Sequence, residues 1–153
     1  MKGSQIVVAG EPRGIFEEGI IDTADVYPGT VVELDPAAGI ESGRPHIKAA
    51  SATSAGPLFV ARESELNGGN WQTGYSVGDR IFVYCPADGE DLNMRLTTTT
   101  TGTGTNVVMS IGDTLIVSTG GELAVGSTPA TDPFLCMEDV TEGELAWCKY
   151  RGK

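Results

Sequence analysis

The chain has 153 residues, of which 40% are hydrophobic, and this size and composition suit one compact domain with one core. Its 21 acidic and 10 basic residues give a formal net charge of −11, which repels phosphate backbones and argues against nucleic-acid binding. No apolar run approaches the roughly 18 residues that cross a bilayer, and the apolar stretch in MKGSQIVVAGEPRG is too short for a signal peptide, so we expect a soluble, unprocessed protein.

The first segment, residues 1–25, mixes Gly, Pro and charges around small apolar islands, which favours an N-terminal arm preceding a β domain at residues 26–153. Its apolar side chains are candidates for contact with a partner: Ile6, Val7, Val8, Ile15, Phe16, Ile20 and Ile21. The same residues would also suit an edge strand packed into the domain's own core, and the sequence leaves both interpretations open. If the arm interpretation holds, deleting the residues before Gly19 should abolish partner binding and leave the fold intact.

The rest of the chain is divided by Gly, Pro and polar clusters into short extended pieces, so we expect an all-β fold. Helix signals are weak, and the expected architecture is a small barrel, tulip-like or sandwich β domain of about nine or ten strands. RIFVYC is apolar on both faces, as in a strand covered on both sides, whereas DLNMRL alternates as if it had one buried face. The expected strands are Thr30–Leu34, Leu58–Ala61, Arg80–Cys85, Asp91–Leu96, Val107–Met109, Leu115–Val117, Glu122–Val125, Phe134–Asp139 and Leu145–Tyr150.

One phrase occurs three times, as YPGTVVEL, YSVGDRIFVY and SIGDTLIVS. In each, a Gly stands where the backbone must turn tightly or adopt a positive φ, and a strand follows at once. The residue after the Gly is Thr30, Asp79 or Asp113, whose side chain can bond to nearby backbone amides. This phrase predicts architecture and carries no chemistry.

No motif of nucleophilic, phosphate-binding or metal-dependent catalysis is present, so we expect no enzyme and nominate no catalytic, cofactor-binding or metal-binding residue. His46 is the one histidine, in SGRPHIKAA, which we expect to be a surface connection. The acidic stretch ADGEDLN lacks the oxygen ligands and the final Glu of an EF-hand loop. Cys85, Cys136 and Cys148 form no CxxC pair and are expected to be small buried hydrophobes with free thiols.

Two further features have alternative interpretations. TTTTTGTGTN, residues 97–106, is either a low-complexity hairpin loop or an arm that a partner orders. Trp71, Trp147, Tyr75 and Tyr84 could anchor an interface, although core packing is the commoner use of a small aromatic set. Trp147 alternates with Leu145, which favours the core for Trp147.

The order of the phrases resembles the head decoration, or capsid cement, proteins of tailed bacteriophages. The matching stretches are GIIDTADVYPGTVVELD, GPLFVARESELNGGNWQTGYSVGDRIFVYCPADGEDLNMRL, NVVMSIGDTLIVSTGGEL and FLCMEDVTEGELAWCKYRG, which together cover most of the chain. The family pattern has a Pro-Gly before the first strand, a Tyr-x-x-Gly-Asp turn, and a Gly-Asp-x-Leu strand before a Gly-Gly-x-Leu hairpin. The Thr run departs from that pattern, so the resemblance implies nothing about the contacts of this loop.

The resemblance implies a structural role on the virion. Such proteins are synthesised in the host cytoplasm and bind the outside of the expanded head, commonly as homotrimers over three-fold and quasi-three-fold positions of the major capsid protein. It implies no catalysis, no cofactor, and neither a nucleic acid nor a membrane as partner. Two other classes stay open: a virion-displayed carbohydrate- or receptor-binding β module, and a small all-β hydrolase with a carboxylate pair.

Overall fold

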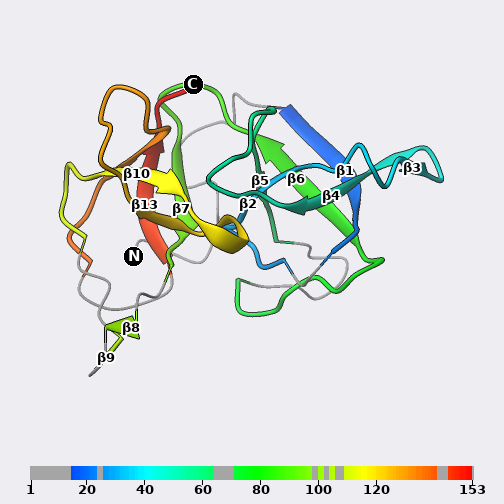
Figure 1. The fold of residues 1–153 in the computed structure, drawn as a ribbon, viewed down its shortest axis with the longest axis horizontal. Coiled ribbons are helices and arrows are strands. Elements are labelled where there is room, and N and C mark those ends of the chain that lie inside the picture. Colours follow the sequence, from blue (N-terminus) through cyan, green and yellow to red (C-terminus); the bar gives the residue numbers. More distant parts are fainter. Residues whose placement is uncertain are drawn as a thin grey trace.

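A computed structural model describes residues 15–23, 26–63, 71–97, 100–101, 104–105, 109–140 and 145–152. Within them the first sheet has the strand order β1-β6-β5-β2-β4-β3, and an additional β1–β4 pairing closes five of these strands into a barrel (Figure 1). Its strands are β1 (Ile15–Ile21), β2 (Val31–Leu34), β3 (Ile40–Glu41), β4 (Arg44–Ala49), β5 (Phe59–Ala61) and β6 (Arg80–Cys85). The all-β prediction is confirmed, and the first half of the chain is a closed barrel.

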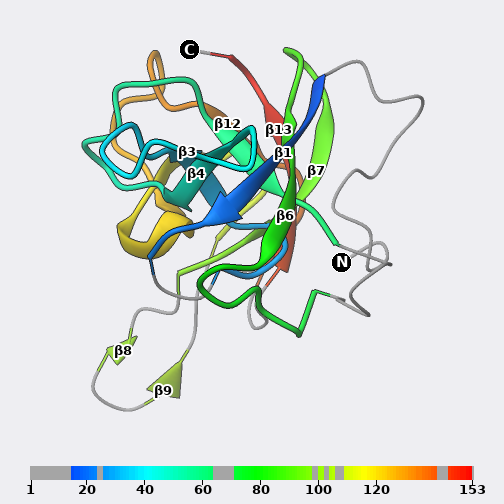
Figure 2. The ribbon, with the colours of Figure 1, turned by 90° about the vertical axis from the view of Figure 1, so that its right-hand side faces the viewer.

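The barrel closes where β1 meets β4. β1 pairs with β6 from Ile15 opposite Cys85 to Ile20 opposite Arg80, and its last two residues pair in parallel with His46 and Ile47 of β4. Figure 2 shows β1 running between β6 and β4. The Ile47 side chain packs against Gly19 so closely that a Cβ on Gly19 would lie 2.2 Å from Cγ1 of Ile47. A residue without a side chain is therefore required at this crossing.

The second sheet has the order β11-β10-β12-β13-β7. Leu96, directly after β7, forms a parallel bridge with Leu123 of β11, which joins the two outer strands of this sheet. Its strands are β7 (Asp91–Arg95), β10 (Thr114–Val117), β11 (Leu123–Val125), β12 (Phe134–Cys136) and β13 (Leu145–Tyr150), with the 3-10 turn η1 (Thr119–Gly121) between β10 and β11. In the Thr-rich segment, β8 (Thr100–Thr101) and β9 (Gly104–Thr105) pair as an antiparallel hairpin.

Alternating side chains on shared strands build two cores. Ile81 and Val83 of β6 belong to the cluster inside the barrel, which also contains Ile21, Val26, Val32, Ile47, Ala61 and Tyr75. Tyr84, on the opposite face of β6, belongs to the larger cluster between the barrel and the second sheet. The prediction that this strand is covered on both faces is confirmed. In β7, Leu92 and Met94 face the larger core as predicted.

The polar face of β7 is also covered, contrary to the expectation of one exposed face. Asn93 is 0% and Arg95 7% exposed. The N–H of Arg95 donates to the carbonyl of Gly29 at 2.9 Å, so the turn before β2 lies along the outer edge of β7. A local alternation pattern cannot predict a contact between segments more than sixty residues apart in the sequence.

The sequence phrase that occurs three times forms the same type of turn each time. Its three turns run from Tyr27 to Thr30, Ser76 to Asp79 and Ser110 to Asp113, and the last N–H of each donates to the first carbonyl at 3.1, 3.0 and 3.0 Å. The Gly residues have positive φ of 86°, 87° and 95°, as predicted. The Asp79 and Asp113 carboxylates accept from the N–H of Ser76 and Ser110 at 2.9 and 2.8 Å.

Each turn is also tied to the end of a neighbouring strand in the same way. The Gly N–H donates to the carbonyl of one residue there, and the N–H of that residue donates back to the carbonyl of the Thr or Asp. The three residues so held are Ala61, Ile21 and Cys136, with all six bonds between 2.8 and 3.0 Å. The turn therefore fixes the register between a new strand and an earlier or later one, which explains its repeated use.

Several strand predictions need correction. The predicted strand Phe134–Asp139 ends at Cys136, and of Val107–Met109 only Met109 is described, as an isolated bridge with Val140. β3 and β4 were not predicted as strands, because Pro45 interrupts their pattern, and β1 was predicted only as the edge-strand interpretation of the arm. Among the described residues no helix is long and apolar enough to span a membrane.

Candidate interaction surfaces

The seven apolar residues of the predicted arm divide into three groups. Ile20 and Ile21 are 8% and 1% exposed, so both side chains lie in the domain's own core rather than on a surface that a partner could contact. Ile15 and Phe16 pair with Cys85 and Tyr84 as part of β1, and Ile6, Val7 and Val8 lie outside the described residues. Because residues 15–21 are a barrel strand, an arm separate from the barrel comprises at most residues 1–14.

The β3–β4 hairpin is the most exposed apolar feature of the barrel half. Figure 1 shows β3 beyond the barrel, at one end of the long axis. The hairpin turns at Ser42 and Gly43, with φ of 51° and 78°, and Ser42 is the one residue other than Gly described with a positive φ. Ile40 is 75% exposed. An exposed β-branched side chain on a tight two-residue turn is well placed to enter a pocket on another protein.

A depression of about 390 Å³ lies at the base of this hairpin, lined by Glu33, Leu34, Pro36, Lys48, Gly56 and Pro57. Leu34 is 40% exposed. The Nζ of Lys48 lies 3.6 Å from Oδ1 of Asp35, so the cation beside the depression already has a carboxylate partner. The lining is mostly apolar, with one acid and one base at its rim. Such a surface suits a protein segment better than a free anion.

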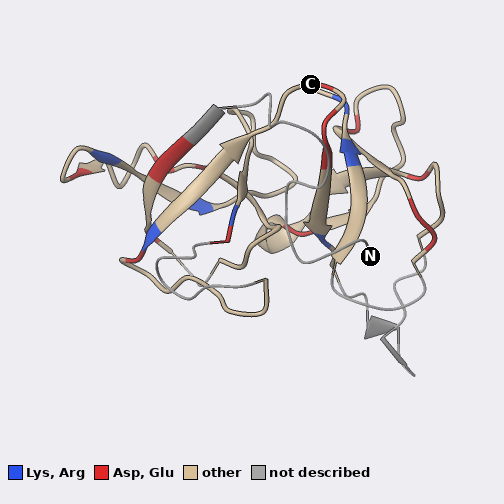
Figure 3. Cartoon of the chain, turned by 180° about the vertical axis from the view of Figure 1, so that it is seen from behind, with Lys and Arg blue, Asp and Glu red and all other residues tan. Residues whose placement is uncertain are grey.

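The outer face of the β1–β4 junction carries polar side chains that lie close to one another. The Nε of Arg44 lies 2.5 Å from Oε2 of Glu18, and the ring nitrogens of His46 lie 3.2 Å from Asp22 and 3.6 Å from Glu41. His46 was expected in a surface connection, but it is half-buried in β4. Figure 3 shows acidic and basic residues on both sheets rather than on one face. The polar side chains at the β1–β4 junction are thus paired, whereas the apolar Ile40 of the β3–β4 hairpin is exposed and remains the better candidate for contact with a partner.

The other exposed apolar side chains are scattered. Val77 and Ile111, 59% and 63% exposed, occupy the position before the Gly in two of the repeated turns, and Val125 at the end of β11 is 49% exposed. The corresponding residue of the first turn, Pro28, is buried. Isolated exposed residues of this kind are common on soluble domains.

The aromatic residues are mostly internal. Tyr75 and Tyr84 are 4% and 0% exposed, which confirms core packing for both. Trp147 is half-buried and lies on the face of β13 opposite to Ala146 and Cys148, so its alternation with Leu145 did not place it in the main core.

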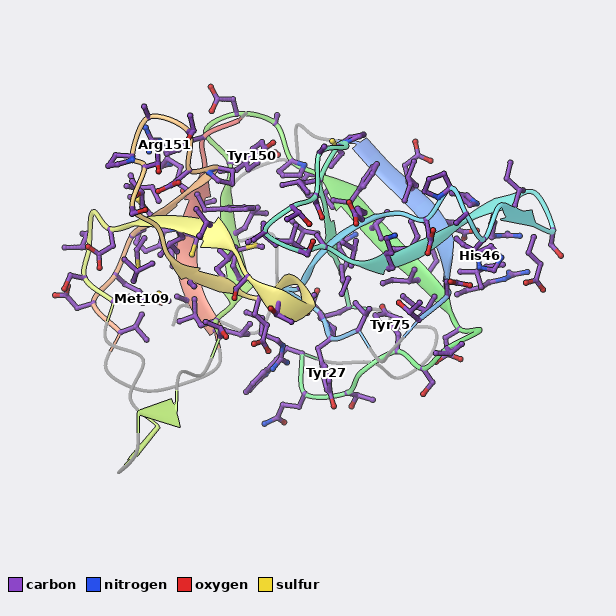
Figure 4. The ribbon with its side chains drawn as sticks, viewed as in Figure 1. Tyr27, His46, Tyr75, Met109, Tyr150 and Arg151 are labelled. Atoms are coloured by element: carbon purple, nitrogen blue, oxygen red, sulfur yellow. The ribbon has the colours of Figure 1, made fainter. Side chains whose placement is uncertain are left out.

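Tyr27 is the most exposed tyrosine described, at 38% (Figure 4). The Arg95 guanidinium lies 4.6 Å from its ring centroid, and a Cβ on Gly74 would lie 3.1–3.3 Å from three ring atoms. These two neighbours occupy ring surface that a sugar would need for stacking.

The buried carboxylates serve the fold. Glu90, in the acidic stretch ADGEDLN, is 6% exposed and accepts from the Tyr84 hydroxyl and the Ala87 N–H at 2.6 Å each. Asp132 accepts from Thr114 Oγ1 at 2.8 Å and from the Thr128 N–H at 3.1 Å. In the described ranges no three His, Cys, Asp or Glu side chains gather as a metal site would need.

A second depression, of about 430 Å³, is lined by Ala130, Thr131, Asp132, Arg151 and Gly152 near the end of the chain (Figure 4). The Nη1 of Arg151 donates to the Pro129 carbonyl at 2.9 Å, and the Arg151 N–H donates to the Pro133 carbonyl at 2.8 Å. Together with the bonds of Asp132, these contacts hold the 128–133 loop against the final strand. The polar groups here are engaged in local structure.

The three cysteines are free thiols. Cys136 and Cys148 are fully buried, as predicted, and Cys85 is half-buried. Burial raises the pKa of the Cys136 thiol and, more strongly, that of Cys148, which lies well above its usual range. A thiol that stays protonated is a poor nucleophile, so neither thiol is activated for catalysis.

No family model matches this chain, and no curated protein matches it. Among solved structures it is similar to the head fiber gp8.5 N base of bacteriophage phi29, with a TM-score of 0.57 and 12% sequence identity. The likeness covers 90% of this chain and 93% of the phi29 chain. At this identity the comparison establishes a shared fold. The resemblance to phage head proteins read from the sequence is thereby confirmed at the level of the fold.

Proposed function

We propose that this protein is a structural component of a phage head that binds the outside of the expanded shell as a decoration protein and stabilises it. The observation that carries the proposal is the likeness to a head fiber base over nine-tenths of both chains, which includes the barrel and the second sheet together. The order of the turn and strand phrases supports it independently, because that resemblance was read from residues and not from the fold.

The surface that we propose contacts the shell is the β3–β4 hairpin with the depression at its base. The residues before β1 would add further contacts. Ile40 of β3 is an exposed apolar side chain of the hairpin, Leu34 at the end of β2 is an exposed apolar side chain of the depression, and Ser42 holds the hairpin tip in a conformation that side chains rarely adopt. Ile6, Val7 and Val8 are the apolar residues of the segment before β1 that could add contacts. A peptide segment that becomes extended on a partner can add backbone hydrogen bonds to a strand of that partner.

Assembly as a homotrimer over three-fold positions would compensate for the small area of each contact. A hairpin tip and a shallow depression offer a weak interaction when taken alone. Three linked copies make the second and third contacts intramolecular, which raises the overall affinity far above that of one copy. The net charge of −11 would keep neighbouring particles apart and limit adhesion to released DNA.

The test is co-sedimentation of the purified protein with expanded, undecorated heads and with unexpanded procapsids of the phage that encodes it. We expect saturable binding to expanded heads alone, at three copies for each three-fold position. Binding to both particles alike would refute dependence on expansion, and binding to neither would refute the decoration role.

Two matched variants locate the contact. Ile40→Asp and Ile111→Asp each place a carboxylate on an exposed Ile, 75% and 63% exposed; Ile40 lies in β3 of the barrel sheet, and Ile111 lies in the turn before β10 of the second sheet. We expect Ile40→Asp to weaken binding at least tenfold while Ile111→Asp binds like the parent. Equal binding by both variants would exclude the hairpin as the contact.

A further inference from the structure

Cys136 and Cys148 stand directly opposite each other in the second sheet. They are register partners on the antiparallel strands β12 and β13. Both side chains are 0% exposed and belong to the same core cluster, so they project from the same face of the sheet. Burial accounts for each residue separately, but it does not account for two thiols at one register position.

The pair occupies a non-hydrogen-bonded position of the ladder. The N–H of Cys136 donates to the Asp113 carbonyl at 2.8 Å, and its carbonyl accepts from the Gly112 N–H at 2.9 Å, so its backbone bonds point away from β13. The next residue, Met137, donates to the Trp147 carbonyl at 2.9 Å. Non-hydrogen-bonded pairs have Cα atoms about 4.5 Å apart, which lies within the range of about 4.4–6.8 Å found for disulfides.

The two thiols also lean the same way. The Cys136 S–H donates to the carbonyl of Glu138 at 3.1 Å, and the Cys148 S–H donates to the carbonyl of Ala146 at 3.5 Å. In this antiparallel register residues 138 and 146 come opposite each other, two positions along from the cysteine pair. Both sulfur atoms are therefore displaced toward the same end of the sheet, and the Cys136 thiol is, after burial, the next cause of the raised pKa of Cys148.

We propose that Cys136 and Cys148 form a cross-strand disulfide when the protein is exposed to a small-molecule disulfide such as oxidised glutathione. The thiolate of one cysteine attacks the glutathione disulfide, which forms a mixed disulfide and releases one glutathione thiolate. The second cysteine, as its thiolate, attacks the protein sulfur of that mixed disulfide and releases the other glutathione thiolate. The protein loses two protons and two electrons, and one glutathione disulfide becomes two glutathione thiols.

The same geometry sets the conditions of the reaction. Both thiols are buried and their pKa values are raised, so little thiolate exists at neutral pH and the oxidation is slow there. Its rate should rise as the buffer becomes alkaline. The cytoplasm keeps thiols reduced, so the bond belongs to the protein after it enters an oxidising medium. Cys85 lies opposite Ile15 of β1 and has no cysteine as a register partner.

The test uses the folded full-length protein, incubated with oxidised glutathione in mildly alkaline buffer and then alkylated under denaturing conditions. We expect a monomer about 2 Da lighter before alkylation, with one of its three thiols still alkylated. Trypsin cannot separate the pair, because no Lys or Arg lies between Arg95 and Lys149, so the digest uses a protease that cleaves after Glu. A linked peptide pair containing Cys136 and Cys148 is the expected product.

Two variants test whether the disulfide joins Cys136 and Cys148. Cys85→Ser should still lose about 2 Da, whereas Cys136→Ala should retain Cys85 and Cys148 as thiols or as glutathione adducts. The oxidised protein should also unfold at a higher urea concentration than the reduced protein, and dithiothreitol should remove the difference. Three alkylated thiols after prolonged incubation, a linkage that involves Cys85, or covalent dimers alone would overturn the proposal.

Discussion

Deleting β1 should unfold the protein, and deleting only the residues before it should not. The perturbation is a pair of truncations, one that removes residues 1–14 and one that removes residues 1–21. The shorter deletion stops before the first barrel strand. The longer deletion removes all six pairs with β6 and both parallel pairs with β4. The barrel then has two open edges in place of its closed seam.

The size of the effect follows from burial. Ile20 and Ile21 are 8% and 1% exposed, and burying an Ile side chain fully stabilises a protein by about 1.5–3 kcal/mol. Their loss alone costs about 3–6 kcal/mol, before the exposure of Ile47 and Ile81 at the opened seam is considered. Typical domains have a free energy of unfolding of about 5–15 kcal/mol. The longer truncation should therefore be unfolded or barely folded.

Urea titration monitored by tryptophan fluorescence and circular dichroism measures the difference. We expect the protein without residues 1–14 to keep the parent's midpoint, and the protein without residues 1–21 to show no cooperative transition. Coincident midpoints for the two truncations would refute the placement of β1 in the barrel. If residues 1–25 were an arm outside the fold, both truncated proteins would keep the parent's fold. The arm interpretation of the sequence predicted this outcome for deletion of the residues before Gly19.

Three further changes test the internal structure. Gly112→Ala places a methyl group in open space but at φ +95°, so backbone strain should lower stability by about 1–2 kcal/mol in urea titration, and an unchanged midpoint would mean that this turn relaxes freely. Tyr84→Phe removes the hydroxyl that donates to the buried Glu90 and should cost about 1–3 kcal/mol in the same assay, and an unchanged midpoint would contradict this role of the hydroxyl. Because burial raises the pKa of Cys148 in the folded state, an unfolded chain loses that proton first, from about pH 8.5 upward, so stability falls as the pH rises above that value. Urea midpoints measured between neutral and alkaline pH should decline less steeply in Cys148→Ala than in the parent, and parallel declines would contradict the assignment.

The parts of the fold that the sequence predicts are those with local causes. A Gly at positive φ followed by Thr or Asp produces the same turn in all three phrases, so the turns before β2, β6 and β10 could be located from residues alone. The apolar residues on both faces of β6 and the alternation in β7 likewise identified core side chains, namely Ile81, Val83 and Tyr84 of β6 and Leu92 and Met94 of β7. These features depend on neighbours within a few positions along the chain.

The parts that the sequence missed depend on distant segments. Gly19 interrupts the pattern of β1 because Ile47 of β4 passes against it, and nothing within a few residues of Gly19 indicates that contact. Pro45 similarly conceals β4, although a proline is tolerated where β4 pairs with only the two residues of β3. His46 was taken for a loop residue for the same reason. Closure of the barrel depends on contacts between strands that are far apart in the sequence, so local patterns do not predict it.

The candidate contact surface was only partly accessible to sequence reasoning. Ile40 lies in AAGIESGRP, where one apolar residue among turn formers gives no periodic signal. Its exposure follows from the projection of the hairpin beyond the barrel, which only the structure shows. Conversely, Ile20 and Ile21 looked like arm anchors because an apolar pair reads alike in a core strand and in a binding segment.

The central claim is tested most directly by an electron cryomicroscopy reconstruction of expanded heads incubated with the purified protein. The account predicts added density on the outer surface at three-fold and quasi-three-fold positions, fitted by three copies with the β3–β4 hairpins directed at the shell. Heads without added density, or density whose fitted hairpins point into solvent, would contradict it.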